Sequence, residues 1–192
     1  MTEKEYQTAI QQYEWDELKE MWHKRHDNNF PKEWKKGKFF EYAILRAFEL
    51  EGAKVLYPYN VDYPQTVIAG EEVVEQIDGV IYTDNLCVIA ESKDYSRKNI
   101  DIEPLAKLQV RLKRRPATVI GCLFTASDFT WPALALIETL MPYTILLWNN
   151  SDIEYCFENR KFLEGLKLKY RNMIEKCNHM FDLTAFAQLN GI

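Results

Sequence analysis

The sequence predicts a mixed α/β domain in which a central sheet is flanked by helices. Its 192 residues suit one domain of ordinary size, and its 47% hydrophobic and 28% charged residues are close to the averages of folded globular proteins. Segments with apolar residues at helical spacing alternate with short apolar runs of strand length. The expected order of elements is α, α, β, β, β, α, β, α, β, α.

The N-terminal part is expected to be helical. Residues 1–27 are polar with apolar side chains at helical spacing, which predicts one amphipathic helix before the breaker at 27–31. A second helical pattern opens at Gly37 and ends at Gly52, the expected C-cap. Residues 53–59 are rich in apolar and aromatic side chains and predict the first strand.

The middle of the chain predicts a hairpin. After an expected loop over residues 60–72, two apolar runs at 72–83 and 86–93 are separated by the turn pair Asp84-Asn85. A polar pair of this kind between two strand-like runs favours a two-residue hairpin turn. The two runs are therefore expected to pair as antiparallel neighbours.

The remaining elements alternate between the two types. Pro104 stands in the first turn of an expected helix that ends near Arg115, before Pro116. Residues 118–124 and 144–148 are apolar runs of strand length, with a helix at 132–140 between them, and from residue 151 onward the pattern is mainly helical.

The expected hairpin brings charged side chains together. A two-residue loop at Asp84-Asn85 puts Asp78 opposite Glu91, with Lys93 on the same side of the sheet as Glu91. Two carboxylates at such a distance repel by about 4 kcal/mol at an effective dielectric constant near 20. One interpretation is that a cation compensates the repulsion between the two carboxylates. The alternatives are a slipped register that turns Glu91 to solvent, or a plain Lys-Glu pair on the surface.

A third carboxylate belongs to the second helix. Glu41 directly follows Phe40 in the sequence. It lies next to the apolar stripe of this helix, which must pack on the sheet. Converging carboxylate oxygens are the ligands that Mg²⁺ or Mn²⁺ prefers. The alternative interpretation makes Glu41 an ordinary residue at the border of a helix stripe.

The order of these residues resembles a known family. Glu41 on a helix, Asp78 on a strand and Glu91-Ser92-Lys93 on the next strand resemble the PD-(D/E)xK signature of nucleases with restriction-endonuclease-like folds. Further strings strengthen the resemblance to the Mrr-like restriction endonucleases: residues 37–41 (GKFFE), 76–80 (QIDGV), 123–125 (LFT) and 129–130 (FT). The resemblance extends over about residues 37–157.

The resemblance implies a domain plan and an activity. The fold would be restriction-endonuclease-like, with residues 1–192 as one domain, a nuclease-like core at 37–157 and helical extensions at 1–36 and 158–192. The activity would be that of a metal-dependent DNA endonuclease in restriction, defence or DNA repair.

The resemblance also implies roles for individual residues. Asp78, Glu91 and the main-chain carbonyl of Ser92 would bind Mg²⁺ or Mn²⁺. Lys93 would orient the attacking water, and Glu41 would hold a second metal or its water shell. Gln109, on the helix after the hairpin, is expected to support the site from outside.

Charge is unevenly distributed, although the net charge is -5. Residues 22–38 hold six Lys or Arg against two acids, and residues 92–116 hold eight against three. Two basic segments in an otherwise acidic chain are either solvated faces or a surface that binds a polyanion. The expected DNA-binding residues are Lys35, Lys36, Lys38, Arg97, Lys98, Lys107, Arg111, Lys113, Arg114 and Arg115.

Two other functions stay open: a non-cleaving nucleic-acid-binding or assembly module with the same fold, and a structural protein whose terminal helices mediate dimerisation. DNA is the expected partner, and a homodimer would suit cleavage of both strands. No membrane segment is expected, and the absence of a signal-peptide pattern after Met1 predicts a cytoplasmic protein. Four scattered cysteines are expected to be reduced core residues.

Overall fold

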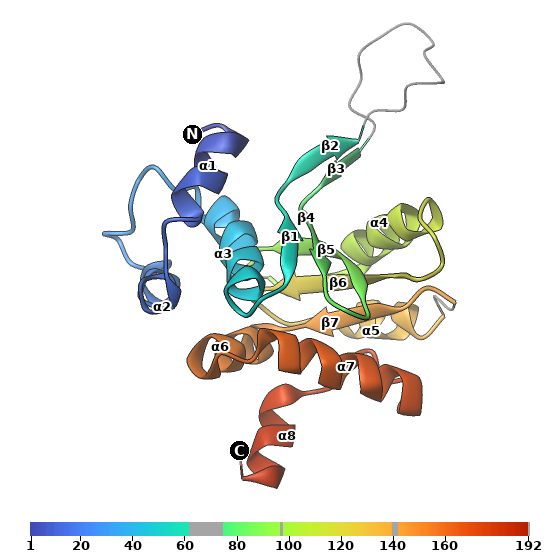
Figure 1. The fold of residues 1–192 in the computed structure, drawn as a ribbon. Coiled ribbons are helices and arrows are strands. Elements are labelled where there is room, and N and C mark those ends of the chain that lie inside the picture. Colours follow the sequence, from blue (N-terminus) through green and yellow to red (C-terminus); the bar gives the residue numbers. More distant parts are fainter. Residues whose placement is uncertain (62–74, 97, 140–141, 192) are drawn as a thin grey trace, which may run out of the picture.

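A mixed central sheet covered by helices on both faces forms the protein (Figure 1). The structure is a computed structural model that describes residues 1–61, 75–96, 98–139 and 142–191. The described strands are β1 (Lys54–Leu56), β2 (Tyr59–Val61), β3 (Glu75–Ile77), β4 (Gly79–Tyr82), β5 (Cys87–Lys93), β6 (Val119–Thr125) and β7 (Ile145–Trp148). The described helices are α1 (Glu3–Ile10), α2 (Trp15–Lys24), α3 (Lys36–Leu50), α4 (Ile102–Lys113), α5 (Trp131–Ile137), α6 (Asn150–Asn159), α7 (Phe162–Lys176) and α8 (Leu183–Asn190).

The central sheet has the strand order β1-β4-β5-β6-β7. Strands β1, β4 and β5 are antiparallel neighbours, whereas β6 and β7 run parallel to β5. A separate antiparallel pair, β2 and β3, extends from one end of this sheet (Figure 1). The predicted fold class, a mixed sheet flanked by helices, is confirmed.

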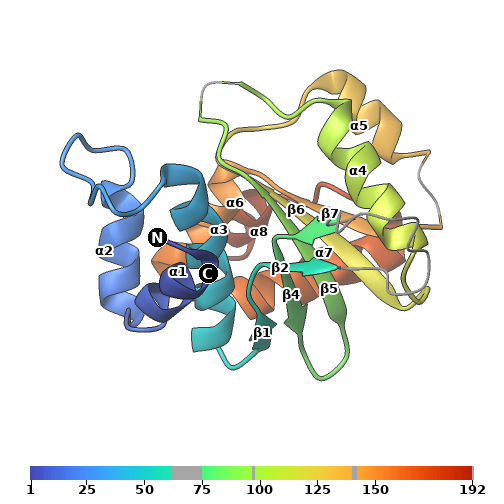
Figure 2. The same ribbon diagram turned by 90° about the horizontal axis from the view of Figure 1, so that it is seen from above.

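The sheet divides the core into two layers. Helix α3 lies on one face with α1, α2, α6 and α7 around it, and α4 and α5 lie on the other face (Figure 2). Successive side chains of β5 point to opposite faces of the sheet. Ala90 packs in the layer on the α3 side, and Ile89 packs in the layer on the α4 side. This alternation decides which side chains of β5 can meet α4.

The N-terminal prediction of one helix over residues 1–27 is wrong, because the structure has two helices. The chain turns after Ile10, and the carboxylate of Glu17 then accepts a hydrogen bond from the N–H of Glu14 at 3.2 Å, which caps α2. Both helices pack on α3, as the contacts of Tyr6 with Tyr42 and of Trp22 with Phe40 indicate. A single straight helix would carry one of these contacts away from α3.

Two predicted strands are divided. The strand expected at 53–59 becomes β1 and, after Pro58, β2, so residues 60 and 61 belong to a strand and not to the expected loop. The strand expected at 72–83 is interrupted at Asp78, where the chain passes from β3 to β4. Residues 62–74, which hold the rest of that loop and the expected start of that strand, lie outside the described residues.

The predicted hairpin register is confirmed. Gly79 pairs with Ala90, and Tyr82 pairs with Cys87. The N–H of Thr83 donates to the carbonyl of Leu86 at 2.9 Å, which closes the turn around Asp84-Asn85. This register places Asp78, one residue before β4, at the level of Glu91.

Smaller predictions have mixed outcomes. Gly52 has a φ of 100° and ends α3, as expected of a C-cap glycine. All four cysteines are free, but Cys177 is exposed and therefore not part of the core, because the last turn of α7 faces solvent there. Among the described residues, no helix combines the length and apolarity needed to cross a bilayer.

Candidate active site

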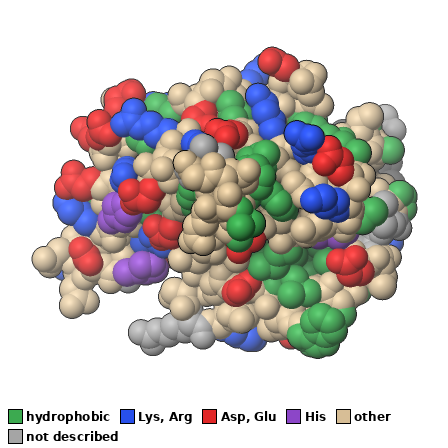
Figure 3. All heavy atoms as spheres, turned by 90° about the horizontal axis from the view of Figure 1, so that it is seen from below, with side chains coloured by type: hydrophobic (Ala, Val, Ile, Leu, Met, Phe, Trp, Pro, Cys, Tyr) green, Lys and Arg blue, Asp and Glu red, His purple; other side chains and the backbone are tan. Residues whose placement is uncertain are grey.

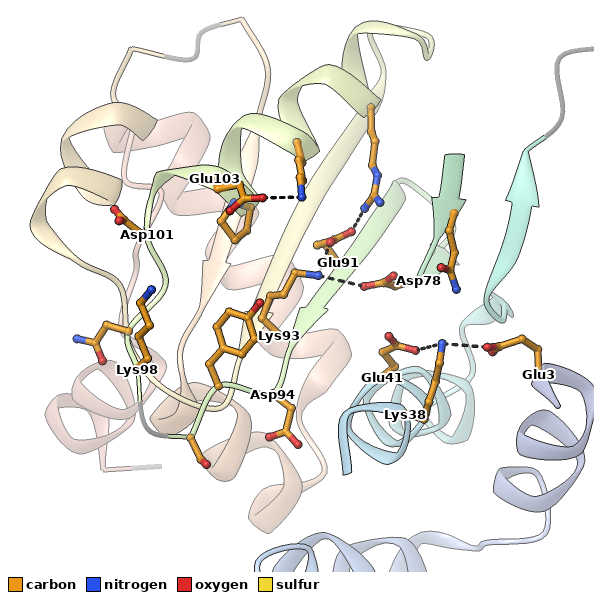
Figure 4. A pocket seen from close by; sticks show the side chains of 17 residues that line it. Glu3, Lys38, Glu41, Asp78, Glu91, Lys93, Asp94, Lys98, Asp101 and Glu103 are labelled. Atoms are coloured by element: carbon orange, nitrogen blue, oxygen red, sulfur yellow. Dashed lines mark hydrogen bonds and ion pairs between the residues drawn. The ribbon is translucent and has the colours of Figure 1, made fainter. Parts of the chain in front are cut away.

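Four charged residues predicted from the sequence line one cavity. Its volume is about 1010 Å³, and it lies at the end of the sheet between α3 and α4 (Figure 4). Glu41 enters from α3, Asp78 from the start of β4, and Glu91 and Lys93 from β5. The structure thus brings these four side chains together from separate parts of the chain.

The cavity is richer in acids than in bases. Among the described residues that line it, seven are acidic and five are basic. The acids are Glu3, Glu41, Asp78, Glu91, Asp94, Asp101 and Glu103, and the bases are Lys38, Lys93, Lys98, Lys107 and Arg111. An excess of carboxylates favours a bound cation in the cavity.

Glu91 is the most deeply buried of these acids, with 2% of its surface exposed. It lies on the face of β5 that α4 covers, because it alternates with Ala90. Lys93 Nζ lies 2.6 Å from Oε1 of Glu91, and the guanidinium of Arg111 contacts Oε2. Two cations therefore compensate this buried carboxylate.

Asp78 is held by the main chain of the neighbouring strand. The N–H of Ser92 donates a hydrogen bond to Oδ2 of Asp78 at 2.9 Å. This bond ends the ladder between β4 and β5, which explains why the expected strand is interrupted here. Lys93 Nζ lies 4.0 Å from the same Oδ2 atom, so Lys93 faces both Asp78 and Glu91.

Glu41 occupies the α3 side of the cavity. Its pKa is raised to about 7, first because burial disfavours the charged form and second because Asp78 carries a like charge nearby. Lys38 opposes this rise in part, since its Nζ lies 2.9 Å from Oε2 of Glu41. Lys38 also contacts Glu3 of α1 at 3.1 Å (Figure 4).

The donor set fits a divalent cation that keeps part of its water shell. Oε2 of Glu91 is a buried oxygen that lies against the guanidinium of Arg111. Among the described residues, no group of three or more His, Cys, Asp or Glu side chains is arranged to hold a metal ion. Mg²⁺ does not require such a group, because it is commonly bound through one or two carboxylates and several waters. Asp78 and Glu91 provide these two carboxylates.

The basic residues expected to bind DNA are only partly gathered at the cavity. Lys38, Lys98, Lys107 and Arg111 line it, and Arg114 lines a shallower groove beside it on α4. Lys35 and Lys113 are exposed near the ends of α3 and α4, and Arg115 is bonded to Glu75. Arg97 and the side chain of Lys36 lie outside the described residues.

The opposite face has a different character. Seen from below, over α7 and α8, cationic side chains are interspersed with acidic ones (Figure 3). A mixed pattern of this kind is typical of a solvated surface.

Helix α4 lines the cavity with a face that does not include Gln109, and the supporting role expected for Gln109 from outside the site stays a prediction. Gln109 is not among the residues that line the cavity, whereas Pro104, Lys107 and Arg111 are. Residues 104, 107 and 111 share one helix face, and Gln109 lies away from it. The spacing of Lys107 and Arg111 along α4 was the available signal for this face.

Sequence reasoning also missed Glu3 and Glu75. Glu3 lies in the N-terminal extension, and its Oε2 accepts a hydrogen bond from the hydroxyl of Tyr42 at 2.7 Å. Glu75 is 6% exposed and accepts a hydrogen bond from Arg115 at 2.8 Å. No local motif pointed to either residue, since each acts through a partner distant in sequence.

No family model and no curated protein matches the sequence. The crystal structure of AF1548, a protein of unknown function, is 16% identical with a TM-score of 0.43, and the match covers 77% of this chain and 73% of that one. The DNA modification-dependent restriction endonuclease AspBHI is 15% identical with a TM-score of 0.41, and the match covers 88% of this chain but 42% of that one. At these values neither likeness bears on the activity of this chain.

Proposed function

We propose that the protein is a divalent-metal-dependent DNA endonuclease of the PD-(D/E)xK type, similar to Mrr-like enzymes. The observation that supports this proposal is the convergence of Glu41, Asp78, Glu91 and Lys93 on one cavity. These residues come from a helix and two strands in the order and context that the family signature requires. Restriction, defence or DNA repair would be the setting.

Hydrolysis of a phosphodiester needs an activated water and compensation of the charge that develops on the phosphoryl oxygens. A bound Mg²⁺ or Mn²⁺ would supply both effects. Asp78 and Glu91, with the main-chain carbonyl of Ser92, would hold it, because these hard oxygen donors suit such cations. Burial of Glu91 keeps this carboxylate in a region of low dielectric, where its charge acts strongly.

Lys93 would position the attacking water. Its Nζ atom lies between Oε1 of Glu91 at 2.6 Å and Oδ2 of Asp78 at 4.0 Å. An ammonium group at this point can donate a hydrogen bond to a water molecule and favour its deprotonated form. The same charge would help to stabilise negative charge on the phosphoryl group.

Glu41 would complete the site from α3. A carboxyl group with a pKa of about 7 exchanges its proton readily at neutral pH, as a general base must. A second cation or its water shell would lie next to this carboxyl and would stabilise its ionised form. Lys38 would keep the side chain pointed into the cavity through their 2.9 Å contact.

The substrate would be bound mainly through its phosphates. Lys98, Lys107 and Arg111 line the cavity, and Arg114 lies beside it. Contacts from such residues to phosphates give affinity without sequence specificity and depend strongly on salt. A symmetric dimer would place two such sites on opposite strands.

The test is cleavage of supercoiled plasmid with and without Mg²⁺ or Mn²⁺. Lys93→Ala and Asp78→Asn are expected to abolish metal-dependent nicking. Asp84→Asn at the exposed hairpin turn and Lys54→Ala on β1 are matched controls that should cleave like the unsubstituted protein. Cleavage that survives both site substitutions would contradict the proposal.

One observation favours a second function, a non-cleaving nucleic-acid-binding module with the same fold. Both oxygens of Glu91 already contact cations of the chain itself, Lys93 and Arg111. DNA retention that depends on salt, without nicking in either metal, would support this module.

A further inference from the structure

Arg111 lies between two buried carboxylates. Its Nε atom is 3.4 Å from Oε1 of Glu75, and its Nη1 atom contacts Oε2 of Glu91. Glu75 and Glu91 are 6% and 2% exposed, and each would be costly to bury without a compensating charge. The guanidinium of Arg111 therefore compensates the charge of two acids, Glu91 in the cavity and Glu75 in the groove beside it.

The contact with Glu91 is an ion pair inside the protein. Arg111 Nη1 and Glu91 Oε2 are both buried and lie against each other. A bound cation can supply the same compensating charge. This is also the carboxylate oxygen that a bound cation would need.

Glu75 provides the guanidinium of Arg111 with a second charged partner. Glu75 is anchored independently, because Arg115 donates to its Oε2 at 2.8 Å. Arg111 can therefore give up Glu91 and keep a charged partner. A small change in its side-chain torsions suffices, since both acids already contact the same guanidinium.

We propose that Arg111 is a positioning residue that acts as a built-in substitute for the metal. It neutralises Glu91 when no cation is bound, and it withdraws toward Glu75 when a cation takes Oε2. Arg111 then sets the metal affinity of the site through Glu91 and prevents tight binding of stray cations. This inference rests on the proposed metal-dependent function, because it requires a cation at Glu91.

The experiment is titration calorimetry of the full chain with Mn²⁺ in the absence of DNA. Arg111→Gln removes the competing charge, so we expect its Kd for Mn²⁺ to fall by about tenfold or more. Glu75→Gln removes the partner to which Arg111 withdraws, so we expect the Kd to rise by at least about threefold. Lys54→Gln is the control, because it removes the same charge at an exposed residue of β1 that does not line the cavity. Its Kd should change less than twofold.

Thermal unfolding provides a second readout. Without its cation, Glu91 in Arg111→Gln is less well compensated, so this variant should unfold at a lower temperature in EDTA. Mn²⁺ should then raise its Tm by more than it raises that of the unsubstituted protein. A large rise also demonstrates that the variant is folded.

The outcomes separate this inference from the proposed function. Equal or weaker Mn²⁺ binding by Arg111→Gln, or unchanged binding by Glu75→Gln, would overturn the role of Arg111 and leave the metal site intact. If neither the unsubstituted protein nor Arg111→Gln bound Mn²⁺, both the role of Arg111 and the proposed function would be overturned.

Discussion

Gly79 leaves room for Leu45 of α3. A methyl group at residue 79 would lie 2.6 Å from Cδ2 of Leu45, well inside van der Waals contact. Gly79 follows Asp78, and Leu45 lies one helical turn after Glu41. The close approach of these two residues therefore sets how near α3 comes to the sheet at the point where Glu41 and Asp78 share the cavity.

Gly79→Ala is expected to destabilise the protein by about 1–3 kcal/mol, because overpacking pushes α3 from the sheet. It should also reduce metal-dependent cleavage by moving Glu41 away from Asp78. Chemical denaturation and plasmid nicking check the two effects. Gly37→Ala is the control, since a methyl group there has no atom within 4 Å and lies in a helix, where alanine is favoured. Wild-type stability in Gly79→Ala would refute the argument.

The stability of the metal-free protein should fall as pH rises through the titration of Glu41. Its folded-state pKa of about 7 lies above the ordinary value of 4.5 for a glutamate, so the folded state binds the proton more tightly. Between these pH values the folded state holds more protons than the unfolded state, and its stability decreases with rising pH. Glu41→Gln should remove up to about 3 kcal/mol of this decrease. Chemical denaturation in EDTA at pH 5 and pH 8 measures this loss of stability. An equal loss in the unsubstituted protein and in Glu41→Gln would rule out Glu41 as the cause.

A buried ion pair holds the C-terminal helices together. Lys169 Nζ lies 2.7 Å from Oδ2 of Asp152, and both side chains are almost completely buried. Lys169→Met leaves the carboxylate unpaired and should cost about 3–5 kcal/mol. The double variant with Asp152→Asn should recover part of that loss. Lys161→Met, at a partly exposed pair with Glu164, should cost less than about 1 kcal/mol. Equal losses in Lys169→Met and Lys161→Met would contradict this assignment.

DNA binding should depend on salt through the cations of α4. Removing one phosphate contact lowers the slope of log K against log salt by about one. We expect this change for Lys107→Ala and for Arg114→Ala, measured by fluorescence anisotropy in Ca²⁺. Lys167→Ala on α7 is exposed and distant from the cavity, so its slope should stay unchanged. Identical slopes for all of these proteins would place the DNA elsewhere.

The central hairpin and its register could be predicted because they depend on local signals. Alternating burial fixes which face each strand residue occupies, and the two-residue turn at Asp84-Asn85 fixes the pairing. From these two facts Asp78 falls opposite Glu91 without any long-range information. The same reasoning placed Lys93 beside Glu91.

Other features depend on contacts between distant segments and could not be predicted. The break between α1 and α2 follows from packing of both helices on α3, which leaves little trace in local spacing. The interruption at Asp78 follows from its bond to Ser92. The contacts of Arg111 with both Glu75 and Glu91 depend on how α4 is rotated against the sheet.

The most direct test of the metal site is a crystal soaked in Mn²⁺ and measured at a wavelength where manganese scatters anomalously. The account predicts an anomalous peak within about 2.5 Å of carboxylate oxygens of both Asp78 and Glu91, with the Arg111 guanidinium moved toward Glu75. An occupied Mn²⁺ site elsewhere, with Arg111 still on Glu91 and no peak between Asp78 and Glu91, would contradict it.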